Sequence, residues 1–195
     1  MFDPAFDGVA AEAAARMLRG TDAADLGQHG EAMTQFWLAA VAYDRLDDPA
    51  GTAVAAARFG ESALEMGEFP EAEEALTTAE ATFRYLDRDD DVARVRMVLG
   101  RVRFATGSYR TAVAQLQKAI DHFSPKRDRP SRLEWARATA DLAEVELAQN
   151  NPRRASKQLG EALEVFIDCG STDDEFDARI ALASVACEKA PSCTA

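Results

Sequence analysis

The sequence predicts an all-α fold, a solenoid of antiparallel helix pairs, and two observations carry this prediction. Small residues recur at a step of 40 positions along the chain: Gly20, Gly60 and Gly100, then Gly27, Gly67 and Gly107, and then Ala32, Ala72 and Ala112. Alanine is abundant, and only seven prolines interrupt the 195 residues, a composition that favours helix. Because one amphipathic helix pair cannot bury its apolar stripe alone, neighbouring pairs must stack on one another.

A fourth, weaker copy of the repeat follows, and residues typical of helix ends locate the individual helices. Ala143, Asn150 and Ala155 stand at the equivalent points 43 residues on. Prolines suited to a first helical turn stand at Pro4, Pro49, Pro70 and Pro152, and Ser131 with Glu134 has the pattern of a capping box. We therefore expect helices at residues 4–26, 31–46, 49–66, 70–86, 90–106, 110–123, 131–149, 152–168 and 172–188.

These residues resemble the tetratricopeptide repeat, whose signature is a leucine-glycine pair, a glycine-aromatic turn and then an alanine. Two copies match it closely, Leu99-Gly100 with Gly107, Tyr109 and Ala112, and Phe59-Gly60 with Gly67, Phe69 and Ala72. The 40-residue step is similar to a variant with longer helices. The resemblance implies a right-handed α-solenoid of about nine helices in a single domain over residues 1–195, with repeats at about 10–47, 49–87, 90–123 and 131–168 and a capping helix at 172–188.

The resemblance also implies a concave groove, lined by the first helix of each pair, that captures a segment of a partner protein. The register places on this groove Met17, Thr21, Val54, Ala57, Glu61, Leu64, Arg94, Met97, Arg101, Phe104, Arg137, Ala140, Glu144 and Leu147. Arginines there could hold a carboxylate through two parallel hydrogen bonds, beside apolar contacts from Met97 and Phe104. The partner we expect is a protein or peptide, with an acidic segment or a free C-terminus as one candidate.

Basic side chains are concentrated in the middle of the chain, and this distribution allows two interpretations of the groove arginines. The net charge is −12, yet residues 94–137 hold 11 basic and 3 acidic side chains, net +8. Residues 1–93 have a net charge of −14 and residues 138–195 one of −6, which disfavours nucleic acid as a partner. In the alternative interpretation, the arginines of residues 94–137 are neutralised by the acidic side chains of the chain itself.

No pattern in the sequence calls for catalysis, a metal or a cofactor, and we expect none of them. A phosphate-binding glycine loop and a nucleophile motif are both missing. His29 and His122 are far apart, and Cys169, Cys187 and Cys193 fit no common zinc spacing. The N-terminus has no signal-peptide pattern, and no apolar stretch approaches the roughly 20 residues that span a bilayer. We therefore expect a cytoplasmic protein that does not bind membranes, and the 18 arginines against 4 lysines suggest a bacterial source.

The function predicted from the sequence is an interaction scaffold or adaptor. Two other functions remain open at this stage: a secretion-type chaperone that binds an unfolded segment, and a regulatory module that senses a peptide or small ligand. The sequence is also compatible with a homo-oligomer, and it identifies neither the partner nor the biological process.

Overall fold

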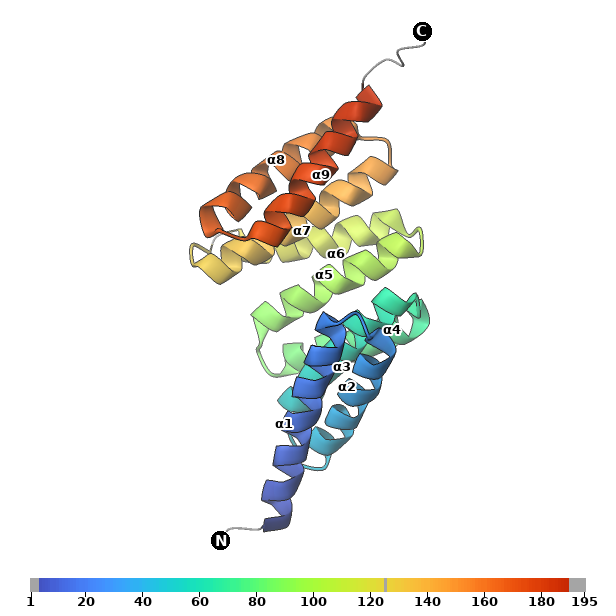
Figure 1. The fold of residues 1–195 in the computed structure, drawn as a ribbon, viewed down its shortest axis with the longest axis vertical. Helices are drawn as coiled ribbons and strands as arrows, with labels where there is room; N and C mark the ends of the chain where they lie inside the picture. Colours follow the sequence, from blue (N-terminus) through green and yellow to red (C-terminus); the bar gives the residue numbers. More distant parts are fainter. Residues whose placement is uncertain (1–3, 125, 190–195) are drawn as a thin grey trace. The chain divides into compact units, whose positions relative to one another are not determined.

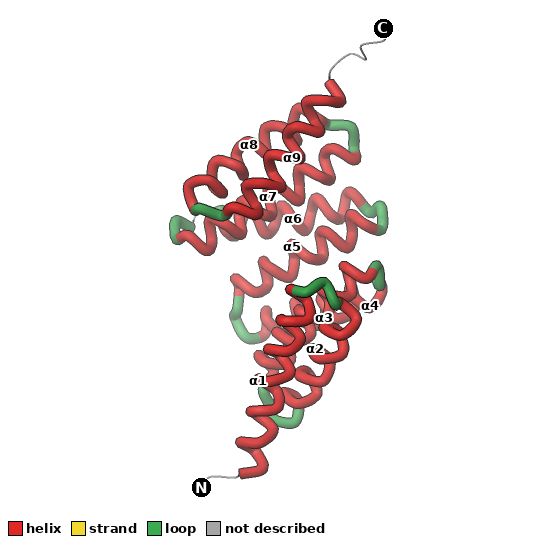
Figure 2. Tube along the Cα trace, in the orientation of Figure 1, coloured by secondary structure: helices red, strands yellow, loops and turns green. Residues whose placement is uncertain are grey.

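The computed structural model describes residues 4–124 and 126–189, over which the chain forms nine α-helices and no strand (Figures 1 and 2). The helices are α1 (Pro4–Asp25), α2 (His29–Asp44), α3 (Pro49–Met66), α4 (Phe69–Tyr85), α5 (Asp89–Ala105), α6 (Tyr109–Phe123), α7 (Arg129–Ala148), α8 (Pro152–Cys169) and α9 (Thr172–Lys189). Each observed end lies within two residues of the expected one, so the all-α prediction is confirmed.

The chain divides into two compact units, Met1–Val102 and Arg103–Ala195, and the division falls in the last turn of α5. They are called unit 1 and unit 2. In unit 1, α1 packs on α2, α2 on α3 and α3 on α4; in unit 2, α6 packs on α7, α7 on α8 and α8 on α9. The single domain expected over residues 1–195 stays a prediction.

One set of repeated glycines ends the first helix of each pair. Gly27, Gly67 and Gly107 have φ angles of 71°, 77° and 74°, and Asn150 has 61° at the equivalent point of the fourth copy. Glycine adopts this left-handed conformation without steric cost, and asparagine tolerates it better than most side chains. The 40-residue step of these glycines is therefore the step of a helix–turn–helix unit.

The other set of glycines marks the points where paired helices touch. A Cβ atom added at Gly60 of α3 would lie 2.6 Å from Cγ of Leu76 in α4. A Cβ atom at Gly20 of α1 would lie 2.6 Å from a ring carbon of Phe36 in α2. Both facing side chains are buried, Leu76 with 0% and Phe36 with 1% of their surface exposed. The two helices of a pair can approach this closely because the first carries no side chain at the contact.

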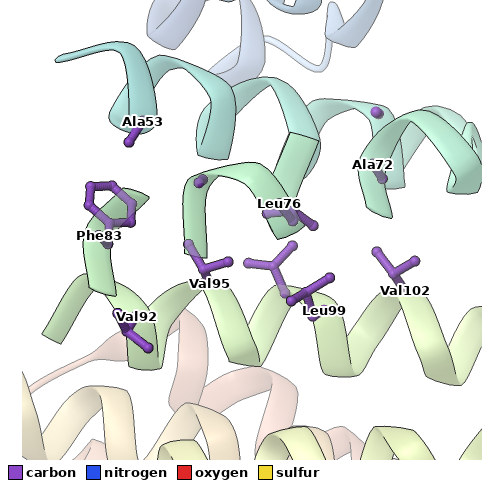
Figure 3. Close-up of a cluster of buried hydrophobic side chains, with 11 residues drawn as sticks. Ala53, Ala72, Leu76, Phe83, Val92, Val95, Leu99 and Val102 are labelled. Carbon is purple, nitrogen blue, oxygen red and sulfur yellow. The ribbon is translucent and has the colours of Figure 1, made fainter. Parts of the chain in front are cut away.

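Large apolar side chains from the second helix of each pair fill the core. In unit 1, Leu76 and Phe83 of α4 belong to one cluster with Val92, Val95 and Leu99 of α5 (Figure 3). In unit 2, Phe166 of α8 packs with small residues of α7, α8 and α9: Ala136, Ala162 and Ala178. Burial of one Leu or Phe side chain contributes about 1.5–3 kcal/mol, so these clusters stabilise the stacked pairs.

Helix α7 begins differently from our expectation. Asp128 is its N-cap and accepts a hydrogen bond from the backbone N–H of Ser131 at 3.0 Å. This backbone hydrogen bond lowers the pKa of the Asp128 carboxyl below its ordinary value. The capping box predicted at Ser131 and Glu134 is wrong, because the helix starts two residues earlier and Ser131 is already inside it.

Neither a membrane-spanning helix nor a metal-binding cluster is found among the described residues. There, no helix is long and apolar enough to cross a bilayer, and no group of three or more His, Cys, Asp and Glu side chains could hold a metal ion. Cys169 is buried at the end of α8. The side chain of Cys187 and the whole of Cys193 lie outside the described residues.

Replacing Gly60 with alanine tests the close approach of paired helices. Gly60→Ala should lower the free energy of unfolding by about 1–3 kcal/mol, because the added methyl group meets the fully buried Leu76 side chain. Gly160→Ala is the matched control, since Gly160 is also inside a helix but has no atom within 4 Å of an added Cβ. The free energy of unfolding of Gly160→Ala should be about 0.5–1 kcal/mol higher than that of the wild type, because alanine favours a helix interior more than glycine does. Equal effects of the two variants in urea unfolding would contradict the account.

Candidate partner-binding groove

Unit 1 contains a hollow lined mainly by α1, α3 and α5, the first helices of their pairs, and we call it the unit-1 hollow. Its volume is about 320 Å³. It is lined by residues of α1, α2, α3 and α5: Thr21, Ala24, Asp25, His29, Phe36, Arg58, Glu61, Ser62, Glu65, Val98 and Arg101. Its size is at the lower end of the range for ligand pockets, and it holds both apolar and charged groups.

Two ion pairs lie at the rim of the unit-1 hollow. A guanidinium nitrogen of Arg101 in α5 lies 2.7 Å from a carboxylate oxygen of Glu65 in α3. Arg58 and Glu61, one turn apart in α3, are 2.9 Å apart. The side chains of Arg101 and Glu65 are 45% and 44% exposed, so water screens their attraction. An exposed pair of this kind contributes only about 0.2–1 kcal/mol, so a partner carboxylate could exchange with Glu65 at little cost.

His29 is the residue of this hollow that sequence reasoning missed. It is the first residue of α2 and is half-buried, whereas the expected helices at residues 4–26 and 31–46 left it in the turn between them. Its Nδ1 atom is buried and has no hydrogen-bond partner within the described residues. A buried nitrogen without a partner is uncommon, and it belongs to a residue that lines the hollow. No feature of the sequence around His29 indicated this placement.

Only part of the set predicted from the sequence lines the unit-1 hollow. Thr21, Glu61 and Arg101 do, and Leu64 is half-buried against the core of the unit. Arg94 is exposed and pairs with Asp91 one turn earlier at 3.1 Å. Met97 is buried, with 7% of its surface exposed, and therefore offers little surface to a partner. The register of an ideal helix does not reveal this burial, because it depends on which neighbours cover the helix.

Two further residues of the predicted groove, Phe104 and Arg137, belong to unit 2. Phe104 is half-buried and packs on Tyr109, with ring centroids 5.9 Å apart. Arg137 of α7 lines a smaller hollow of about 160 Å³, together with Ala140 and Glu144 of α7 and several residues of α9. Arg137 donates from Nε and Nη2 to the carboxylate of Asp174 in α9, at 3.2 and 2.9 Å.

The contact between Arg137 and Asp174 shifts the pKa values of both side chains. The hydrogen bond to Asp174 raises the pKa of Arg137 above its ordinary value. Burial alone would raise the pKa of Asp174, but hydrogen bonds from Arg137 and from the hydroxyl of Ser171 lower it below its ordinary value. Arg137 holds Asp174 through two hydrogen bonds and Asp174 is only 23% exposed, whereas Glu65 beside Arg101 is 44% exposed. The unit-1 hollow is therefore the better candidate for a partner.

The Arg137–Asp174 pair should stabilise unit 2 in a pH-dependent way. Asp174→Asn should lower the free energy of unfolding by about 0.5–1 kcal/mol at pH 7. Because the pKa of Asp174 is lowered by folding, the wild-type advantage is complete above the unfolded value of about 3.9 and disappears as the pH falls through the folded value. Urea unfolding from pH 7 to about pH 3 measures the difference.

The control for this experiment is Asp168→Asn, which removes an exposed carboxylate that pairs with Arg132 at 3.0 Å. The Asp168 side chain is 65% exposed, so its loss should change the stability by less than about 0.5 kcal/mol. A loss at Asp174 no larger than the loss at Asp168, or one that persists at the lowest pH, would contradict a role for the Arg137–Asp174 pair.

Antiparallel helix pairs with glycine at the contact and at the turn define a class of helical repeat scaffolds. The family model for the tetratricopeptide repeat matches residues 51–124. This range runs through α3, α4, α5 and α6 and contains the two copies that follow the signature most closely. Residues 51–124 thus match the tetratricopeptide repeat, and the resemblance predicted from the sequence is confirmed over this range.

Solved structures of low sequence identity share this fold. BtubC from P. vanneervenii has a TM-score of 0.69 at 16% identity, over 81% of this chain and 64% of its own. The apo form of RapI has a TM-score of 0.70 at 14% identity, over 91% of this chain and 49% of its own. A Podosopora anserina kinesin light chain-like protein with nearly identical TPR-like repeats has a TM-score of 0.66 at 15% identity, over 94% and 87%. No curated protein matches the sequence.

These likenesses show the fold alone, an all-α repeat solenoid. This chain spans less than two thirds of the length of BtubC and about half that of RapI. Tetratricopeptide-type repeats point to a protein–protein interaction scaffold, a class that is typically not enzymatic.

Proposed function

We propose that the chain is an adaptor that captures a segment of a partner protein in the unit-1 hollow, with Arg101 as the anchor. The observation that carries the proposal is the placement of an exposed, weakly paired arginine at the rim of a hollow of about 320 Å³. A carboxylate of the partner would replace Glu65 and accept two parallel hydrogen bonds from the guanidinium group. The partner segment is therefore expected to carry an acidic side chain or a free C-terminus.

Apolar side chains line part of the hollow, and the half-buried Ala24 offers more surface to a partner than Phe36 and Val98, which are 1% and 8% exposed. Ala24 of α1, Phe36 of α2 and Val98 of α5 line the hollow between the charged side chains. Burial of apolar surface against them would contribute about 25 cal/mol for each Å² removed from water. Charged groups at the rim would then fix the position of the segment, because electrostatic complementarity gives specificity more than affinity.

A small-ligand sensor is the second candidate, favoured by the unpartnered Nδ1 atom of His29. A hollow of this volume can hold a compact ligand, and a buried polar group without a partner inside the protein suits a ligand that completes it. For this candidate the decisive contact would be with His29 rather than with Arg101. The placement in the cytoplasm of a bacterium and a role as a secretion-type chaperone remain predictions from the sequence.

Selection of peptides tests the adaptor directly. A library of random peptides displayed on phage is panned against the wild-type chain and against Arg101→Glu. We expect the wild type to enrich peptides with an acidic residue or an acidic C-terminus, and we expect Arg101→Glu to lose these peptides, with an affinity lower by at least about tenfold. Arg101→Glu should remain folded, because the Arg101–Glu65 pair is exposed.

The matched control is Arg84→Glu, which reverses an exposed arginine of α4 in the same unit. Arg84 pairs with Glu80 of its own helix and does not line the hollow. This variant should enrich the same peptides as the wild type. Equal enrichment by wild type and Arg101→Glu would remove Arg101 from the proposal, and loss of the same peptides in a His29→Ala variant alone would favour the sensor.

A further inference from the structure

A third hollow lies in unit 2, where the connection between α6 and α7 meets α7 and α8, and we call it the basic hollow. Its volume is about 290 Å³. It is lined by Phe123, Ser124, Lys126, Arg127, Arg132, Trp135 and Val165. It belongs to the basic stretch of residues 94–137 that the sequence singled out, and the proposed adaptor function does not use it.

The charge of the basic hollow differs from that of the other two. Three of its lining residues are basic and none is acidic. The unit-1 hollow is lined by three acidic residues, and the smaller hollow of unit 2 by four. In a protein with a net charge of −12, a hollow whose charged lining residues are all basic attracts an anion more strongly than the other two hollows do.

The three basic side chains differ in the contacts that they make within the folded chain. Lys126 lies 3.1 Å from the Nε2 atom of His122, with its ammonium group 5.5 Å from the centre of the Phe123 ring. Arg132 pairs with Asp168 at 3.0 Å, but that carboxylate is 65% exposed and readily exchanged. Arg127 is exposed, and no hydrogen bond or ion pair holds it within the described residues. Its guanidinium group is therefore available to a ligand.

Three of the residues that line the basic hollow are apolar. Trp135 of α7 is half-buried, Phe123 at the end of α6 is 1% exposed, and Val165 comes from α8. Aromatic walls favour a planar or aliphatic group packed against them, while the basic rim favours a carboxylate or a phosphate. One molecule that satisfies both has an anionic group joined to an apolar body.

We infer that the basic hollow binds a carboxylate or phosphate attached to an aromatic or aliphatic group. The anion lies against Arg127 and Arg132, and the apolar body packs on Trp135. Such a group can come from a small organic anion or from an acidic peptide with a neighbouring aromatic residue. The inference is independent of the adaptor function, because none of these residues lines the unit-1 hollow.

Trp135 itself can report the binding. The chain has two tryptophans, and Trp37 is exposed in unit 1, so Trp37→Phe leaves Trp135 as the single fluorophore. This variant is titrated with phenyl phosphate, with the peptide N-acetyl-glutamyl-phenylalanine amide, and with benzyl alcohol as the neutral control. We expect a saturable change of Trp135 emission with at least one of the two anions and none with benzyl alcohol. Raising NaCl from about 0.05 to about 0.5 M should weaken the binding.

Two further variants, made in the Trp37→Phe background, locate the anion. Arg127→Glu should weaken binding by at least about tenfold, since it reverses a charge at the rim without breaking a contact of the folded chain. Arg153→Glu, at an exposed position of α8 outside the hollow, should bind as well as the parent. Circular dichroism checks that both variants keep the helical fold.

The outcomes separate the sources and decide the inference. Saturation by phenyl phosphate alone indicates a small organic anion, saturation by the peptide alone indicates an acidic peptide, and saturation by both supports the shared chemistry. The inference is overturned if neither anion saturates, if benzyl alcohol gives the same response, or if Arg127→Glu binds as tightly as Arg153→Glu.

Discussion

The structure depends on the close contact between the two helices of each pair. At Gly20 and Gly60 the first helix has no side chain, and the buried Phe36 and Leu76 of the second helix occupy that space. A methyl group there would have to displace a side chain inside a close-packed core, which is costly. The alanines of the second helices fulfil the same requirement from the other side, since Ala32 and others in this register are fully buried.

This packing leaves the polar face of the first helices available for binding. Because the contact uses small residues on one side of α3, its other side can carry the charged groups of the unit-1 hollow, including Glu61 and Glu65. Two ion pairs of α5 differ in how much of their surface is exposed to water. Arg96 is 22% exposed and pairs at 2.9 Å with Glu80, which is 13% exposed, so it ties α5 to α4. Arg101 pairs with Glu65 at the surface and stays exchangeable.

The sequence predicted the helices well and the groove only in part. Turn glycines and first-turn prolines are local signals, which is why Gly67 and Pro49 located helix ends correctly. The aromatic series of Phe83, Phe123 and Phe166, all at most 2% exposed, repeats with the same steps and could have strengthened the prediction. Side-chain burial and pairing depend on neighbours distant in sequence: Met97 is buried, and Arg137 is engaged by α9. His29 lines a hollow for the same reason, since residues of α1, α3 and α5 complete it.

The most direct test of the central claim, that the unit-1 hollow holds the partner segment, is nuclear magnetic resonance of the ¹⁵N-labelled chain with a peptide enriched in the selection. The account predicts that backbone amide shifts concentrate on residues that line the hollow, such as Thr21, Ser62 and Val98. Thr78 and Thr82, on the exposed side of α4, should not shift. Shifts that concentrate on α4, or that spread evenly over unit 1 without a maximum at the hollow, would contradict it.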